Sequence, residues 1–423
     1  MLEITPFGSS AATGGCGVEQ LEPRQFLSGS SMMASGMLDY WPGDPMTPPV
    51  TQPTGGTSNP VTQPSGGTSN SVNQPQRRHQ RGSAVFTQTN LVSDGATPAA
   101  VTDPNLVNPW GIAFNPQAFW WVADNETGVS TLYDSTGAIS PPDTPLVVNI
   151  PTPADPTGGG APTGIVFSGG NGFAVTNGTA TGASRFLFAT EDGTIAGWSP
   201  DVDATHAIIA VDNSAAGAIY KGVAVATTKA GDQLLAADFH NAKIDVFDAS
   251  FAPVAPGKGV KSPFTDKKLP AGFAPFNVQV LGGKVYVAYA QQDAAGEDEV
   301  AGAGLGFVDI YNTKGKLTKR LNGGTNFNAP WGLAQAPKTF GRFGGDVLVG
   351  NFGDGKIMAF KKSGHFDGFL LDASNNPIVI DGLWGLGFGN DQQAGPSTTL
   401  FFAAGTNDEA NGLFGSLVPA ATP

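Results

Sequence analysis

The feature that most constrains this chain is a repeated unit that occurs six times between residues 84 and 419. Each copy contains a turn, a short apolar run, a second apolar run that ends in polar or acidic residues, a third run in which side chains alternate, and a more variable fourth run. One residue marks the start of the first run in each copy: Gly111, Gly164, Gly222, Asn277, Gly332 and Gly385. Successive markers are 53 to 58 residues apart. This spacing predicts six copies of one structural unit.

The apolar runs predict strands rather than helices. They alternate in polarity, are rich in Val, Ile, Phe and Tyr, and are separated by turn residues. The chain contains 59 glycines and 33 prolines, and only 13% of its 423 residues are charged, which suits many short strands joined by tight turns. Six four-stranded units predict an all-β, six-bladed β-propeller over residues 84–423.

The two ends of this region predict how the ring closes. The last copy ends near Pro419 with room for three strands, whereas residues 85–95 form a strand without a unit of its own. Pairing the two would complete the sixth blade and leave no exposed sheet edge at that point. We therefore expect an N-terminal outer strand to close the propeller.

The Trp-Gly pairs in the first, fifth and sixth copies indicate a structural role. Their glycines suit a crowded position near the axis, where there is little room for a Cβ atom. In the second strand of the first copy, Trp120 and Trp121 point to opposite faces, so we expect at least one of them to pack between blades.

The first 83 residues differ in composition from the repeats. An 11-residue tandem occupies residues 49–59 and 60–70 and holds almost no large apolar side chain, which predicts an extended linker over 41–83. The basic run at 76–81 ends this linker. It is interpreted as a solvated linker end, with an acidic-surface contact or a processing site as the alternatives.

Residues 21–28, LEPRQFLS, resemble the Leu-Glu-Pro-Arg segment of planctomycete surface and exported proteins, with Phe26 where leucine is common. The resemblance implies that residues 1–40 act as a sorting segment and that the folded domain is extracytoplasmic or at the cell surface. The first thirty residues lack the basic and apolar regions of a standard signal peptide. No run approaches the 18 or so apolar residues of a spanning helix, so no transmembrane segment is predicted.

The charge of the chain argues against one class of partner, and its cysteine content excludes two ways of stabilising the fold. The formal net charge is −13, which argues against nucleic acid as a partner because backbone binding needs clustered Lys and Arg. Cys16 is the single cysteine, so neither a disulfide nor a multi-thiolate zinc site can stabilise the fold. We expect a monomer stabilised by its apolar core.

The repeats resemble NHL-type and gluconolactonase-like propeller units, and the opening NLVSDG, NPWGIAFNP and WVADNETG resembles an uncharacterised bacterial propeller family. The resemblance implies that the loops entering the inner strands share one face with the loops between second and third strands. Polar residues follow each second strand, so this face would carry an acidic ring formed by Asp124, Asn125 and Glu126; Glu191 and Asp192; Asp238, His240 and Asn241; Gln291, Gln292 and Asp293; Asn351 and Asp354; and Asn407, Asp408 and Glu409. The residues at the starts of the inner strands would lie near the same rim: Trp110, Thr163, Lys221, Phe276, Trp331 and Trp384. The candidate ligand-binding residues on it are Trp110, Asp124, Asn125, Asp238, His240, Asn277, Trp331, Asn351 and Trp384.

The acidic and amide residues of this ring have two interpretations. Asp and Asn cap tight turns through nearby backbone amides, which hairpins need in any case. Alternatively, the oxygen atoms of Asp124, Asp238, Asn277 and Asn351 could hold Ca²⁺ or Mg²⁺. Asp238 and His240 are two residues apart on a strand end, so their side chains point to the same side. This arrangement suits metal binding, acid–base chemistry or a hydrogen-bonded turn.

Three functions remain open. The first is an exported propeller that binds a small molecule, a glycan or a surface protein. The second is a divalent-metal hydrolase, because lactonase-like relatives hold a cation with Glu, Asn and Asp and use it to polarise an ester. Here Trp110 and Gly111 stand where those enzymes usually supply the Glu. The third is a structural component of the cell envelope.

Overall fold

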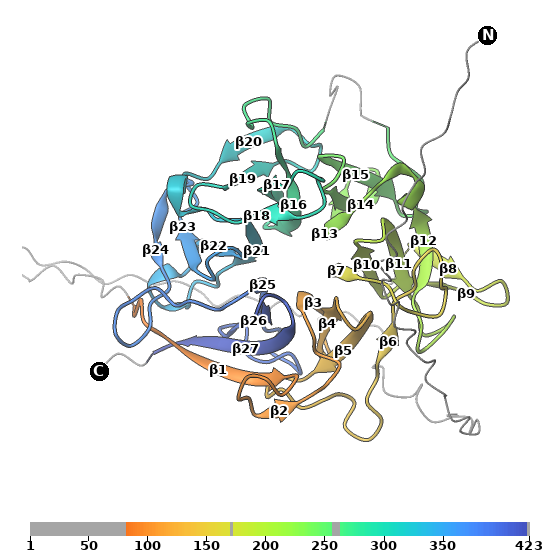
Figure 1. Ribbon diagram of the computed structural model, residues 1–423, viewed down its shortest axis with the longest axis horizontal. Helices are drawn as coiled ribbons and strands as arrows, with labels where there is room; N and C mark the ends of the chain where they lie inside the picture. The colour runs from red at the N-terminus through yellow and green to blue at the C-terminus, as the bar shows by residue number, and fades with distance from the viewer. Residues whose placement is uncertain (1–81, 170–171, 256–262, 421–423) are drawn as a thin grey trace, which may run out of the picture. The chain divides into compact units, whose positions relative to one another are not determined.

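The computed structural model describes residues 82–169, 172–255 and 263–420. These residues form six antiparallel blades around a common centre (Figure 1), which confirms the predicted six-bladed, all-β propeller. The predicted sorting segment at 1–40 and nearly all of the 41–83 linker lie outside the described residues.

The first three blades follow the predicted repeats. Blade 1 contains β3 (Pro109–Phe114), β4 (Trp120–Asp124), β5 (Val129–Tyr133) and β6 (Val148–Asn149). Blade 2 contains β7 (Pro162–Phe167), β10 (Phe186–Thr190), β11 (Thr194–Trp198) and β12 (Ile208–Asp212), with an inserted hairpin of β8 (Ala174–Thr176) and β9 (Thr181–Ala183). Blade 3 contains three strands, β13 (Tyr220–Thr228), β14 (Gly231–Asp238) and β15 (Lys243–Asp248).

The last three blades complete the ring. Blade 4 contains β16 (Phe273–Leu281), β17 (Lys284–Gln292), β19 (Gly306–Tyr311) and β20 (Leu317–Arg320), and β18 (Glu299–Val300) pairs with the end of β17. Blade 5 contains β21 (Pro330–Gln335), β22 (Val347–Asn351), β23 (Ile357–Phe360) and β24 (Phe366–Phe369). Blade 6 contains β25 (Leu383–Phe388), β26 (Leu400–Thr406) and β27 (Asn411–Pro419).

The ring closes as the sequence predicts. The N-terminal strand β1 (Phe86–Ser93) pairs antiparallel with β27, from Phe86 opposite Pro419 to Ser93 opposite Leu413, with a register shift between Asn90 and Val92 (Figure 1). The short strand β2 (Val101–Thr102) then pairs parallel with β1. The Phe86 ring is buried, 4.7 Å from that of Phe340, so the first strand also contributes to the core.

The inner strands approach one another closely at the axis. A Cβ atom added to Gly111 would lie 2.7 Å from the Thr163 carbonyl oxygen, and one added to Gly164 would lie 2.7 Å from the Val223 nitrogen. The axial cavity that these strands enclose has a volume of about 10 Å³, no more than one water molecule needs. The Trp-Gly pairs therefore mark inner strands of a closed ring.

Large aromatic residues fill the spaces between blades. Trp120 is buried against Phe401 of blade 6, with ring centroids 5.1 Å apart, and Trp121 is buried against Phe186 of blade 2, at 4.2 Å. Both tryptophans of β4 are thus inter-blade residues, which confirms the prediction that at least one of them packs between blades.

Helical structure is minor in the described residues. It consists of three single 3-10 turns, at Ser214–Ala216, Gly324–Asn326 and Gly341–Phe343. None of these is long enough to cross a membrane.

Candidate functional site

The loops that enter the inner strands lie beside the loops between second and third strands. The pairing shows this directly, because Pro109 lies opposite Asp124, Tyr220 opposite Asp238, and Pro330 opposite Asn351. In each of these blades, the two kinds of loop therefore lie on the same face, as predicted. Residues from different repeats, far apart in the sequence, together form this face.

An aromatic cluster closes the axis below this face. It consists of Trp110, Phe239, Phe276, Trp331 and Trp384, with Phe352 packed against it. The rings of Trp110 and Trp384 are stacked 3.5 Å apart, and Trp331 meets both edge-on at about 6 Å. The three tryptophans predicted for the ligand-binding face are therefore buried as a floor under it.

Two of the three indole N–H groups in this floor have a hydrogen-bond acceptor among the described residues, and the third does not. Trp331 donates to the Lys221 carbonyl oxygen at 3.1 Å, and Trp384 donates to Asn108 Oδ1 at 3.2 Å. The N–H of Trp110 is buried without a hydrogen-bond partner among the described residues. An unmet donor of this kind costs about 1–3 kcal/mol.

Lys221, the second residue of β13, lies over this floor. Its side chain is 1% exposed, and its ammonium lies 5.1 Å from the Trp110 ring centroid and 5.9 Å from that of Phe239. It is ion-paired with Glu191 and with Asp298, the latter at 3.2 Å. Burial alone lowers the pKa of Lys221, but the charges of the neighbouring carboxylates outweigh it and raise the pKa above its usual value.

Two carboxylates, Glu191 and Asp298, are ion-paired with this ammonium group, and its charge also acts on two further carboxyl groups, Glu299 and Glu409. The four carboxyl groups come from the β10–β11 loop of blade 2, from β18 and the residue before it in blade 4, and from the β26–β27 turn of blade 6. We call the set the Lys221 cluster: Lys221, Glu191, Asp298, Glu299 and Glu409.

The two carboxyl groups without an ion pair have raised pKa values. Burial raises the pKa of Glu299 to about 8, and the charges of Glu409 and Asp298 add to this, while Lys221 opposes it. Burial also raises the pKa of Glu409, whose Oε1 has no hydrogen-bond partner among the described residues. The cluster therefore has more carboxyl groups than positive charges, and the raised pKa values of Glu299 and Glu409 favour their protonated forms.

Blade 1 joins the cluster through amides. Asn125 donates to Glu191 Oε2 at 2.9 Å, and Asn108 donates to Asn125 Oδ1 at 3.4 Å. The predicted binding residue Asn125 is thus part of the network around Lys221.

Asp124 lies next to this network in sequence but has a separate environment. It is fully buried, its Oδ2 accepts a hydrogen bond from Thr131 Oγ1 at 2.7 Å, and its Oδ1 has no partner among the described residues. Burial raises its pKa well above the usual value, and the charge of Asp103 adds to this. Burial therefore favours the protonated form of Asp124, whose side-chain partner Thr131 lies in the same blade.

The remaining predicted residues each have local partners. Asp238 accepts hydrogen bonds from Asn241 and forms an ion pair of 3.4 Å with Lys243. His240 is exposed, and its carbonyl oxygen accepts a bond from Gln292 at 3.2 Å.

The two predicted asparagines are held by backbone groups. Asn277 donates to the Trp331 carbonyl oxygen at 2.7 Å, and Asn351 donates to that of Asn326 at 2.8 Å. No hydrogen bond or ion pair connects any two of Asp124, Asp238, Asn277 and Asn351. In the described part of the chain, no group of three or more His, Cys, Asp or Glu is placed to hold a metal ion.

Sequence reasoning missed Asp298 and Glu299. It assigned the polar end of the second strand in the fourth repeat to residues 291–293, but the chain continues and returns as β18, which pairs with Gln291 and Gln292. The available signal was the acidic run GEDEV at 296–300. A second signal was Lys221, a lysine inside the otherwise apolar YKGVAV strand.

Comparison with known proteins finds similar solved structures and similar sequences. No family model matches the chain. Among solved structures, virginiamycin B lyase from Staphylococcus aureus is 11% identical, with a TM-score of 0.40, over 79% of this chain and 98% of the lyase. A gluconolactonase from Xanthomonas campestris is 17% identical, with a TM-score of 0.36, over 66% of this chain and 90% of that one.

The sequence relatives are viral proteins. Uncharacterized protein R648 of Acanthamoeba polyphaga mimivirus is 35% identical over 339 residues, which cover 77% of this chain and 78% of that protein. Uncharacterized protein L690 of the same virus is 31% identical over 350 residues, which cover 80% of this chain and 87% of that protein. The chain therefore belongs to the same protein family as R648 and L690 of mimivirus.

Proposed function

We propose that this protein is a ligand-binding propeller and that the centre of one face recognises an amine or guanidinium group of its ligand. The observation that carries the proposal is the charge imbalance of the Lys221 cluster, in which one buried ammonium group is ion-paired with two carboxylates and interacts electrostatically with two further carboxyl groups. The charged residues come from blades 2, 3, 4 and 6, so a ligand at this point contacts most of the ring.

The electrostatics favour a cation over a neutral or anionic ligand. An ionised carboxylate attracts a cation 4 Å away by about 4 kcal/mol at the effective dielectric constant of a protein surface. Glu299, with a pKa of about 8, holds a proton at neutral pH. A bound cation stabilises its ionised form, so binding should release a proton and should strengthen as the pH rises toward 8.

A matched pair of probes tests the charge requirement. We expect N-acetyl-lysine methylamide and N-acetyl-arginine methylamide to bind the full chain in titration calorimetry, and the uncharged N-acetyl-norleucine methylamide not to bind. Glu299→Gln combined with Glu409→Gln should weaken binding about tenfold or more. Asp155→Asn, which changes an exposed carboxylate bonded only to Thr157, should leave binding unchanged. Equal binding of the norleucine probe would contradict the proposal.

The metal-dependent hydrolase is the second function considered. Equilibrium dialysis of the full chain with Ca²⁺ and Mg²⁺, followed by metal analysis and a lactone hydrolysis assay, separates it from binding alone. One tightly held cation per chain together with lactone turnover would replace the proposed binding function with hydrolysis. A chain that binds neither metal nor amine would favour a structural component of the envelope.

We also propose that the propeller acts outside the cytoplasm, as a monomer without nucleic acid. The support is the resemblance of residues 21–28 to an export segment, the linker at 41–83 and the net charge of −13. Fusing residues 1–83 to a reporter in the native host should direct that reporter to the cell surface or medium. Retention in the cytoplasm would overturn the proposed location.

A further inference from the structure

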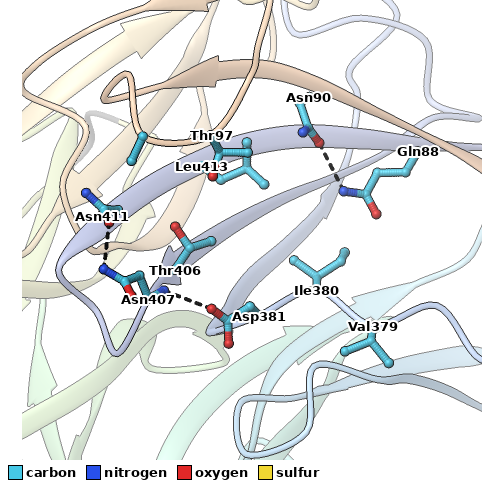
Figure 2. A pocket seen from close by; sticks show the side chains of 11 residues that line it. Gln88, Asn90, Thr97, Val379, Ile380, Asp381, Thr406, Asn407, Asn411 and Leu413 are labelled. Carbon is cyan, nitrogen blue, oxygen red and sulfur yellow. Dashed lines mark hydrogen bonds between the residues drawn. The ribbon is translucent and has the colours of Figure 1, made fainter.

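We infer that a second site, independent of the Lys221 cluster, binds a neutral sugar at the seam where the ring closes. The seam holds a cavity of about 530 Å³ between the N-terminal strand β1, the connection from blade 5 to blade 6 and the β26–β27 turn (Figure 2). This volume lies within the usual range of small-molecule sites, about 300–1,000 Å³.

The cavity is lined by amide groups that are already oriented. Asn407 Nδ2 donates to Asn411 Oδ1 at 3.1 Å, and the Asn407 backbone N–H donates to Asp381 Oδ2 at 2.8 Å. Across the cavity, Gln88 Nε2 donates to Asn90 Oδ1 at 3.0 Å (Figure 2). Because these bonds hold the planar groups in place, their remaining lone pairs and protons can meet neighbouring hydroxyl groups without first being ordered.

One lining hydroxyl group still needs a partner. Thr406 Oγ1 is buried and makes no hydrogen bond within the described residues. A buried polar atom without a partner costs about 1–3 kcal/mol. A hydroxyl group of the ligand would supply that partner.

The rest of the lining defines the ligand class. Val379 is 61% exposed and offers an apolar side chain against which the C–H face of a sugar ring can pack, while Ile380 and Leu413 are buried behind the lining. The lining contains one carboxylate, Asp381, and no basic side chain, so it should repel anionic ligands. Amides, one carboxylate and an apolar patch together suit a neutral polyhydroxylated ring.

The binding measurement uses neutral and acidic sugars on the full chain. We expect at least one of maltose, cellobiose, lactose and methyl α-glucoside to bind in saturation-transfer NMR and calorimetry. We expect glucuronic acid to bind at least fivefold more weakly, because Asp381 repels its carboxylate. Absence of binding by all four neutral sugars at millimolar concentration would overturn the inference, and so would tighter binding of glucuronic acid.

Variants locate the site. Gln88→Ala should weaken sugar binding about tenfold, and Val379→Asp should abolish it by placing a charge on the apolar surface. Thr87→Ala is the matched control, because Thr87 is the exposed neighbour of Gln88 on β1 and points to the other face of the strand.

Glu409→Gln separates this site from the proposed amine site. Glu409 belongs to the same turn as Asn407 but carries a carboxyl group of the Lys221 cluster, so its substitution should leave sugar binding unchanged. Loss of sugar binding in Glu409→Gln or Thr87→Ala, to the extent seen in Gln88→Ala, would overturn the assignment to the seam.

Discussion

The ammonium group of Lys221 lies over the indole ring of Trp110, 5.1 Å from its centroid, at the centre of one face of the propeller. The two residues begin the inner strands of blade 3 and blade 1 and are 111 positions apart in the chain. Their contact connects the aromatic floor that closes the axis to the charged cluster above it.

Replacing Lys221 should destabilise the protein. Lys221→Met keeps most of the apolar length and removes the charge that offsets Glu191 and Asp298. Because Asp298 is 74% exposed and can be solvated, we expect a loss of about 2 kcal/mol rather than the full cost of breaking a buried pair. Urea unfolding at pH 7 measures this loss. Lys356→Met, which breaks a surface pair with Asp354, should cost less than about 1 kcal/mol.

The raised pKa of Glu299 makes stability depend on pH. The folded state keeps the Glu299 proton up to about pH 8, whereas the unfolded chain loses it near pH 4.5. The contribution is therefore complete below pH 4.5 and is lost as the pH rises to about 8. Glu299→Gln should flatten the decline of the melting temperature between pH 5 and 8.5. Parallel curves for the variant and the parent protein would count against the raised pKa.

Asp124 offers a second test of a protonated carboxyl group. Asp124→Asn keeps an oxygen that can accept the bond from Thr131 and cannot ionise. Since the folded-state pKa of Asp124 is raised, its protonated form stabilises the fold at low pH and this contribution is lost as the pH rises. The variant should be more stable than the parent protein at pH 8.5 and similar to it at pH 4, by thermal unfolding with EDTA present. A variant that is less stable at pH 8.5 would indicate that the ionised form is stabilised by another group.

Ring closure predicts the effect of removing the first strand. Deleting residues 84–95 from the full chain takes away β1, exposes the edge of β27 and removes Phe86 from the core of the last two blades. We expect the cooperative thermal transition to disappear in near-ultraviolet circular dichroism. Adding a peptide of residues 82–103 in excess should restore part of it. An unchanged transition after the deletion would show that this strand is dispensable.

Phe86→Ala tests the same closure without shortening the chain. The buried ring packs against Phe340 and Phe343, so its removal should cost about 3–5 kcal/mol in urea unfolding. Thr87→Ala, at the exposed neighbouring position, should change stability by less than about 0.5 kcal/mol.

The sequence by itself determined the architecture. The spacing of the six repeats, the alternation within their strands and the unpaired strand before the first repeat predicted the propeller and its closure, because each depends on local pattern and chain connectivity. The same reasoning predicted that at least one of Trp120 and Trp121 packs between blades, since adjacent strand residues point to opposite faces.

Only the tertiary structure decided which polar residues meet. Six similar turns supply carboxyl and amide groups, and the sequence does not show which of them face the axis and which cap their own hairpins. Asp238 and Asn351 bond within their own blades, whereas Glu191, Asp298, Glu299 and Glu409 converge on Lys221. The physical reason is that the length of each loop, and the return of the chain at β18, decide how close each side chain comes to the centre. The pKa of each carboxyl group then depends on its burial and on charges from several blades.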